Sequence, residues 1–148
     1  MASTLTPTTF KVKITEEQTV KNNVIKNEIT YTIPNVTNVD RRVLTCPQTT
    51  SVDLFNINGP IPGAGTFPSS SLKYVRISNL DDTYSVAVTT SGSQGYFTQE
   101  LTPTSSMFIV SSNITSSNFS GTFGDDIKSI KIYAISGSAN IEYTLINS

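Results

Sequence analysis

The stretch YVRISNLDDTYSVAV, residues 74–88, contains two runs of alternating apolar and polar residues, separated by Asn-Leu-Asp-Asp-Thr. Alternation with a period of two is typical of β-strands that bury one face. The residues between the runs favour turns, so the stretch predicts a hairpin with its corner at Asp81 and Asp82. Adjacent carboxylates also suit a metal site or an acid–base site, and the residues around them are needed to choose between these interpretations.

The same alternation recurs along the chain, with turn signals between the runs. Together with the two runs above, which correspond to residues 72–78 and 84–90, we expect strands over residues 10–14, 25–33, 95–101, 106–112, 127–135 and 140–146. No long window has the i, i+3, i+4, i+7 pattern of an amphipathic helix, and residues 15–27, the one partial match, are interpreted as strand and turn. The pattern predicts an all-β protein, an antiparallel β-sandwich of about eight to ten strands, jelly-roll or immunoglobulin-like.

We expect two parts in the chain, a polar N-terminal arm at residues 1–20 and one sandwich domain at residues 21–148. Phe10 and Val12 share one face of a strand in the arm, where they are candidates to bind a neighbouring chain by strand addition. In the alternative interpretation, this strand is the first strand of the sandwich itself.

Two polar segments interrupt the rhythm of the strands. Residues 56–71 contain three prolines and three glycines, which predicts a surface loop long enough to bind a partner. Its candidate contacts are Pro60, Pro62 and Phe67. Residues 113–126 form the second expected loop.

The composition argues against several classes of partner. The chain has 10 Lys and Arg against 11 Asp and Glu, and so lacks the basic excess that binds nucleic acid or anionic lipid. Thr, Ser and Asn number 22, 20 and 12, whereas charged residues are only 14%, about half the usual share. With one cysteine and no apolar segment of the signal-peptide type, we expect a soluble protein made in the cytoplasm.

The residues offer little catalytic equipment. The chain has no histidine, which excludes His-dependent hydrolases and makes a zinc site improbable on one cysteine. A calcium site at Asp81 and Asp82 with Asp125 and Asp126, or a glycosidase pair of Glu100 with Glu142 or an Asp, remains as an alternative. We expect turns at the two Asp pairs, and neither enzyme activity nor a cofactor or metal.

The segment DRRVLTCP, residues 40–47, contains two of the three arginines in the chain. Arg41 and Arg42 could form ion pairs within the domain or line a charged edge strand. They could also contact another subunit, because arginine is enriched at protein interfaces. Both interpretations stay open from the sequence.

Several segments, taken in order, resemble one class of protein. VDRRVLTCP, a Gly/Pro loop, LKYVRISNLDDTYSVAV, YFTQELTPTSSMFIVSS and DDIKSIKIYAISGSANIEYTLI resemble small virion structural proteins of tailed phages, of the capsid decoration or head-fibre type. The resemblance covers about residues 39–146, and members of that class often have Gly at the position of Thr104.

This resemblance implies a non-enzymatic protein located in the virion, which decorates or cements the capsid or another virion lattice. Its partners would be the major capsid protein or other virion proteins, and copies of the chain would form a homo-oligomer. The alternative is a receptor- or carbohydrate-binding module of a fibre or tail. In that case aromatic residues would cluster at one exposed loop end, with Tyr74, Tyr84, Tyr96 and Phe97 as candidates.

Overall fold

The computed structural model describes residues 6–57, 66–67, 72–92, 95–110 and 128–147. Within these ranges the protein consists of strands and connections without a helix, so the all-β prediction is confirmed. The strands are β1 (Thr8–Val20), β2 (Asn23–Val36), β3 (Asn38–Cys46), β4 (Val52–Ile57), β5 (Thr66–Phe67), β6 (Leu72–Asn79), β7 (Val86–Ser91), β8 (Tyr96–Leu101), β9 (Ser106–Val110), β10 (Ser129–Ala134) and β11 (Ala139–Asn147).

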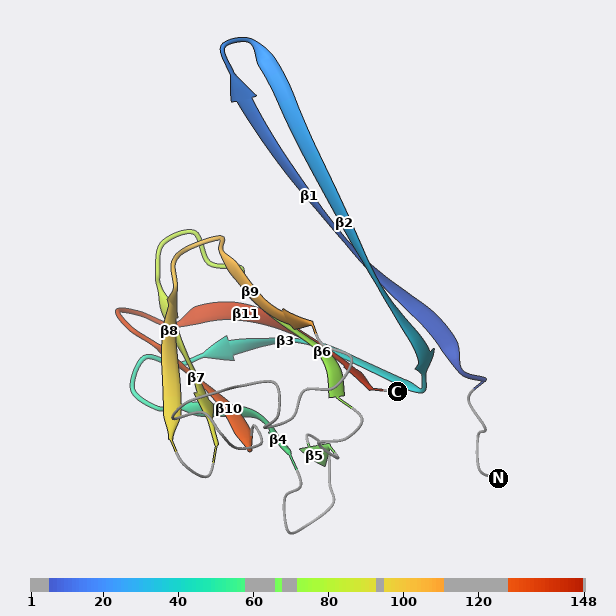
Figure 1. Cartoon of the computed structure of the whole chain (residues 1–148). Coiled ribbons are helices and arrows are strands. Elements are labelled where there is room, and N and C mark those ends of the chain that lie inside the picture. The colour runs from blue at the N-terminus through green and yellow to red at the C-terminus, as the bar shows by residue number, and fades with distance from the viewer. Residues whose placement is uncertain (1–5, 58–65, 68–71, 93–94, 111–127, 148) are drawn as a thin grey trace.

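Two sheets form the body of the molecule (Figure 1). One has the strand order β5-β4-β10-β7-β8 and the other β3-β11-β6-β9. The pairs are antiparallel, except for the two-residue β5 beside β4. Alternate residues of both sheets bury one shared core, which includes Phe55, Ile77, Val88, Ile132 and Leu145. The described strands therefore form the predicted sandwich of two sheets.

β1 and β2 form a separate two-stranded hairpin that extends away from both sheets (Figure 1). Twelve residue pairs connect the strands, from Thr8 opposite Val36 to Val20 opposite Asn23. The turn between them consists of Lys21 and Asn22, whose φ angles of 48° and 66° match the turn that suits the twist of a β-hairpin. The predicted boundary at residue 20 falls at the tip of this hairpin.

A small apolar cluster attaches the hairpin base to the outer face of the four-stranded sheet. Ile33 and Val36 of β2 are buried against Tyr74 of β6 and Ile146 of β11. Phe10 also packs there, with its ring centroid 5.6 Å from that of Tyr74. The base is thus packed on the domain in a second buried cluster, separate from the core between the sheets, whereas the rest of the hairpin extends beyond it.

The corner at Asp81 and Asp82 connects the two sheets. We predicted a hairpin here, and that prediction is wrong: β6 pairs with β11 and β9, whereas β7 pairs with β10 and β8. The side chain of Asn79, at the end of β6, explains the difference. It is buried and donates hydrogen bonds to the carbonyl oxygens of Tyr84 and Leu101, at 2.8 and 3.2 Å, and so directs the chain towards the opposite sheet.

Candidate interaction surface

The β1–β2 hairpin has one apolar face and one polar face, because residues opposite each other on paired strands point to the same side. The register places the following residues on what we call the apolar face: Phe10, Val12, Ile14, Val20, Ile25, Ile29, Tyr31 and Ile33. Glu16, Gln18, Asn23 and Asn27 interrupt this face in its outer half. The other side, which we call the polar face, includes Lys11, Lys13, Glu17, Lys26 and Glu28, with Val24 as its one large apolar residue.

Only the base of the apolar face is covered by the domain. Ile25 is 58% exposed, and Val20, Ile29 and Tyr31 are 41%, 37% and 40% exposed. Exposed apolar side chains that gather on one face of a projecting element, even where polar residues separate them, are candidates for contact with another molecule. The outer half of the hairpin is therefore the candidate interaction surface.

Cross-strand ion pairs stabilise the polar face. The Lys13 ammonium lies 2.8 Å from a carboxylate oxygen of Glu28, and that of Lys26 lies 3.6 Å from Glu17. All four side chains are about half exposed, so each pair contributes at most about 1 kcal/mol. These pairs involve four of the five charged side chains of the polar face.

Phe10 and Val12, our predicted partner contacts in the arm, pack against the domain's own sheet at the hairpin base. β1 nevertheless pairs with β2 outside both sandwich sheets, so it is not the first strand of the sandwich, and strand addition to a neighbouring chain stays a prediction. Ile25, Ile29 and Tyr31 lie in the strand predicted over residues 25–33 and were not predicted to bind a partner. Their alternation in residues 25–33 was visible in the sequence, but nothing in the pattern showed that this strand leaves the sandwich.

Arg41 and Arg42 both form ion pairs within the domain, on opposite sides of β3. Arg41 donates from Nε to Oε1 of Glu142 at 2.6 Å, and the other oxygen of this carboxylate accepts from Nη2 of Arg76, also at 2.6 Å. Arg42 donates from Nε to Asp40 at 2.9 Å, and this hydrogen bond raises the pKa of Arg42. The two arginines nevertheless keep 66% and 51% of their side-chain surface exposed. A contact with another subunit therefore stays a prediction.

The predicted loop contacts are only partly within the described residues. Pro60 and Pro62 lie outside them, as do residues 113–126 and the pair Asp125 and Asp126. For Phe67 the structure gives the backbone, which pairs with Ile57 of β4.

Asp81 acts as a turn residue. Its Oδ1 accepts hydrogen bonds from the backbone N–H groups of Tyr84 and Thr83, at 2.8 and 2.9 Å. These two bonds stabilise the carboxylate and hold the pKa of Asp81 below its usual value, the bond from Tyr84 contributing most. Asp82 accepts from the hydroxyl of Thr83 at 2.8 Å. Among the described residues, no group of three or more His, Cys, Asp or Glu side chains could hold a metal ion.

The two glutamates considered for a glycosidase pair lie on opposite sides of the sandwich. Glu100 is opposite Ala87 on the outer face of the five-stranded sheet, and Glu142 is on the outer face of the four-stranded sheet. They cannot flank one glycosidic bond, since the two carboxyl groups of such enzymes are about 5–10 Å apart. Glu142 is also held by its two arginines.

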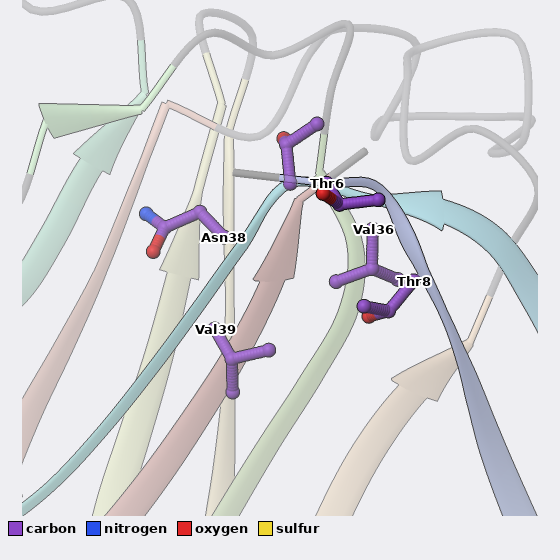
Figure 2. Close-up of a pocket in the computed structure, with 6 residues that line it drawn as sticks. Thr6, Thr8, Val36, Asn38 and Val39 are labelled. Atoms are coloured by element: carbon purple, nitrogen blue, oxygen red, sulfur yellow. The ribbon is translucent and has the colours of Figure 1, made fainter. Parts of the chain in front are cut away.

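A shallow depression of about 280 Å³ lies beside the hairpin base (Figure 2). Six residues line it: Thr6, Thr8, Val36, Thr37, Asn38 and Val39. These side chains supply hydroxyl, amide and methyl groups but no acid or base. The depression therefore offers no titratable group for catalysis.

The aromatic residues considered for carbohydrate binding do not gather at one end of the molecule. Tyr74 is buried under the hairpin base, and the Tyr84 ring packs so closely on Gly137 that a Cβ there would lie 2.6 Å from it. Tyr96 and Phe97 are 74% and 51% exposed, but as successive residues of β8 they point to opposite faces. The four side chains form no common platform for a sugar ring.

Comparisons of the chain with protein-family models, with curated proteins and with solved structures find no match. Within the described residues, the structure contains no helix with the length and apolar character needed to cross a membrane. The function must therefore be inferred from the surface itself.

Proposed function

We propose that the protein is a non-enzymatic structural protein of a virion, which binds and decorates or cements the capsid or another virion lattice through its β1–β2 hairpin. The observation that carries the proposal is the uncovered apolar face in the outer half of the hairpin, where Ile25 is 58% exposed. A two-stranded hairpin alone is marginally stable in water. A long amphipathic one is stabilised when another protein covers its apolar side.

The arrangement of the domain supports a binding role. The sandwich is a rigid base, because both sheets share one buried core, and the hairpin is attached to it through Tyr74 and Ile146. A hairpin that is already folded and projects from a rigid domain can contact a neighbouring surface without a change in the structure of the domain. The carboxylates of Asp81 and Glu142 both have roles within the fold. Asp81 stabilises a turn and Glu142 is held in ion pairs, which suits a structural protein better than an enzyme that uses these groups for catalysis.

The assignment to a virion is supported by the resemblance of residues 39–146 to decoration and head-fibre proteins of tailed phages. We propose a sandwich of jelly-roll or immunoglobulin-like type, synthesis in the host cytoplasm followed by location in the virion, and the major capsid protein or another virion protein as the partner. The receptor- or carbohydrate-binding alternative is less well supported, because the exposed aromatic residues are dispersed.

Co-sedimentation with purified capsids of the encoding virus tests this function. In the variant for comparison, an Asn-Gly turn replaces residues 13–30, so that Val12 and Tyr31 close a short hairpin in their present register. The buried base cluster is retained, and the variant should fold with a similar melting temperature. We expect the full chain to sediment with capsids and the shortened chain to stay in the supernatant. Equal sedimentation of both proteins would contradict the role of the hairpin, and sedimentation of neither would contradict the proposed function.

A further inference from the structure

We propose that two copies of the chain associate edge to edge through β3, so that their four-stranded sheets join into one continuous sheet. The contact is isologous, and its two-fold axis passes between the two copies of Arg41. This surface belongs to the sandwich and is separate from the apolar face of the hairpin. The inference therefore goes beyond the proposed function and does not depend on it.

β3 (Asn38–Cys46) is an edge strand that pairs on one side with β11 and on the other side with no described strand (Figure 1). With nine residues it is the longest edge strand of the described sandwich, since β8, β9 and β5 have six, five and two. Alternate residues of such a strand direct their N–H and C=O groups away from the sheet. A strand from another chain can pair with these groups.

The side chains of β3 are also available to a partner. Val39 and Val43 are 52% and 62% exposed on the outer face of the sheet. Arg41 lies between them, and Arg42 lies on the other side of the strand, next to Asp40. Cross-strand pairs of β-branched residues and of opposite charges stabilise antiparallel strands. The edge therefore contains both kinds of group that a matching strand would need.

One register makes this edge complementary to itself. The outer faces of the two sheets are continuous only where residue numbers of opposite residues differ by an even number, because opposite residues point to the same side. With Arg41 on the axis, Asp40 lies opposite Arg42 of the second copy and Val39 lies opposite its Val43, and each pair occurs twice. With Arg42 on the axis, Arg41 lies opposite Val43 and both kinds of pair are lost.

The charges near the axis are arranged so that they tolerate this register. Two arginines directly opposite each other are unfavourable. Each Arg41, however, donates from Nε to Glu142 of β11 at 2.6 Å, so its guanidinium is drawn over its own sheet and away from the free edge. On the other face, Arg42 already donates to Asp40 of the same strand at 2.9 Å. Across the axis these four side chains therefore alternate in sign, which gives the charge complementarity that points to a second copy as the partner.

Sedimentation velocity of the full chain over a concentration series tests the inference, with two matched variants. Val43 and Val24 are 62% and 60% exposed, the first on β3 and the second on the polar face of the hairpin. Val43→Lys should fold, because Val43 is opposite Glu142 in the home sheet. In the dimer its lysine would face Val39 and lie diagonal to Arg41 of the other copy. We expect Val43→Lys to weaken dimerisation at least about tenfold and Val24→Lys less than about twofold.

Single cysteines test the register. Arg41→Cys places two thiols directly opposite each other, within the Cα separation of about 7 Å that a disulfide allows. Val43→Cys places them four residues apart along the strands, about 13 Å. The native Cys46 is buried. With oxidised glutathione as the oxidant, we expect a disulfide-linked dimer of Arg41→Cys and none of Val43→Cys.

Three results would overturn the inference. A wild-type monomer at every concentration up to about 1 mM would show that the arginines keep this edge apart from other chains. Equal weakening by Val43→Lys and Val24→Lys would place the contact elsewhere, and a disulfide-linked dimer of Val43→Cys in place of Arg41→Cys would exclude the register. The chain shortened at residues 13–30 retains β3 and should dimerise as wild type does. Loss of its dimer would show that the hairpin joins the copies.

Discussion

Asn79 should be the most sensitive position at the corner between the sheets. Its side chain is 1% exposed, and Nδ2 lies 2.8, 3.2 and 3.3 Å from the carbonyl oxygens of Tyr84, Leu101 and Thr102. Its Oδ1 also accepts the N–H of Asp81 at 3.1 Å. The side chain therefore joins the end of β6 to the end of β8 in the opposite sheet and to the turn that leads into β7.

The cost of removing this side chain follows from its hydrogen bonds. An amide nitrogen has two hydrogens, so the three carbonyls share two donors, and the accepted bond makes three in all. At about 1 kcal/mol each, Asn79→Ala should lower the free energy of unfolding by about 3 kcal/mol. For a chain of this length, such a loss lowers the melting temperature by roughly 6–12 °C.

Urea denaturation and thermal melting measure the effect, with Asn140→Ala as the matched control. Asn140 is exposed, and its Oδ1 only accepts a bond from the hydroxyl of Thr45, so its loss should cost less than about 0.5 kcal/mol. Asn79→Asp keeps the shape but directs a carboxylate at carbonyl oxygens, which raises the pKa of the new group. Its cost should thus be smaller in mild acid and grow as the pH rises. An Asn79→Ala variant as stable as the control would refute the role of this residue.

Three further substitutions test other parts of the structure. Thr104 has a φ of 59°, a conformation that a β-branched residue adopts only with strain, so Thr104→Gly should raise the free energy of unfolding by about 1 kcal/mol; a loss in urea denaturation would contradict this. The lowered pKa of Asp81 means that its charged form stabilises the fold above the unfolded value near 3.8, and that this contribution is lost as the pH falls through the lower folded pKa. Melting curves should therefore show Asp81→Asn less stable than wild type at neutral pH, with a difference that shrinks in acid; a constant difference would count against the turn role. Glu142→Gln should cost about 1–2 kcal/mol in urea denaturation, because it weakens the contacts with Arg41 and Arg76, whereas the exposed Glu100→Gln should change little; equal effects would contradict the ion-pair account.

The strands that bury one face were predictable, because their alternation records which side of the sheet meets the core. β10 (Ser129–Ala134) shows this pattern clearly: Ile130, Ile132 and Ala134 are buried, and Lys131 and Tyr133 are exposed. β4 (Val52–Ile57) was not predicted. Its pairing with β10 shifts register at Leu54 and Phe55, so both neighbours are buried and the alternation is broken.

The sequence could not show how the strands are arranged between layers. The residues Asn-Leu-Asp-Asp-Thr indicate a turn, but the choice between hairpin and crossing depends on the contacts of Asn79 with β8, which is distant in sequence. The hairpin presents the same difficulty. Ile25, Ile29 and Tyr31 alternate as in a core strand, since a period of two shows that a face is apolar and gives no information on what covers it.

Hydrogen–deuterium exchange of the hairpin, in the free protein and on the assembled particle, tests the central claim most directly. In dilute solution the outer half of β1 and β2 has few buried contacts, so its amides should exchange quickly, in contrast to the slow exchange of β6, β10 and β11 in the core. On the particle, where a partner covers the apolar face, the amides around Ile14, Ile25 and Ile29 should become strongly protected, and those of the core should change little. If the hairpin exchanged equally fast in both states while protection appeared elsewhere in the sandwich, the hairpin would not be the binding element.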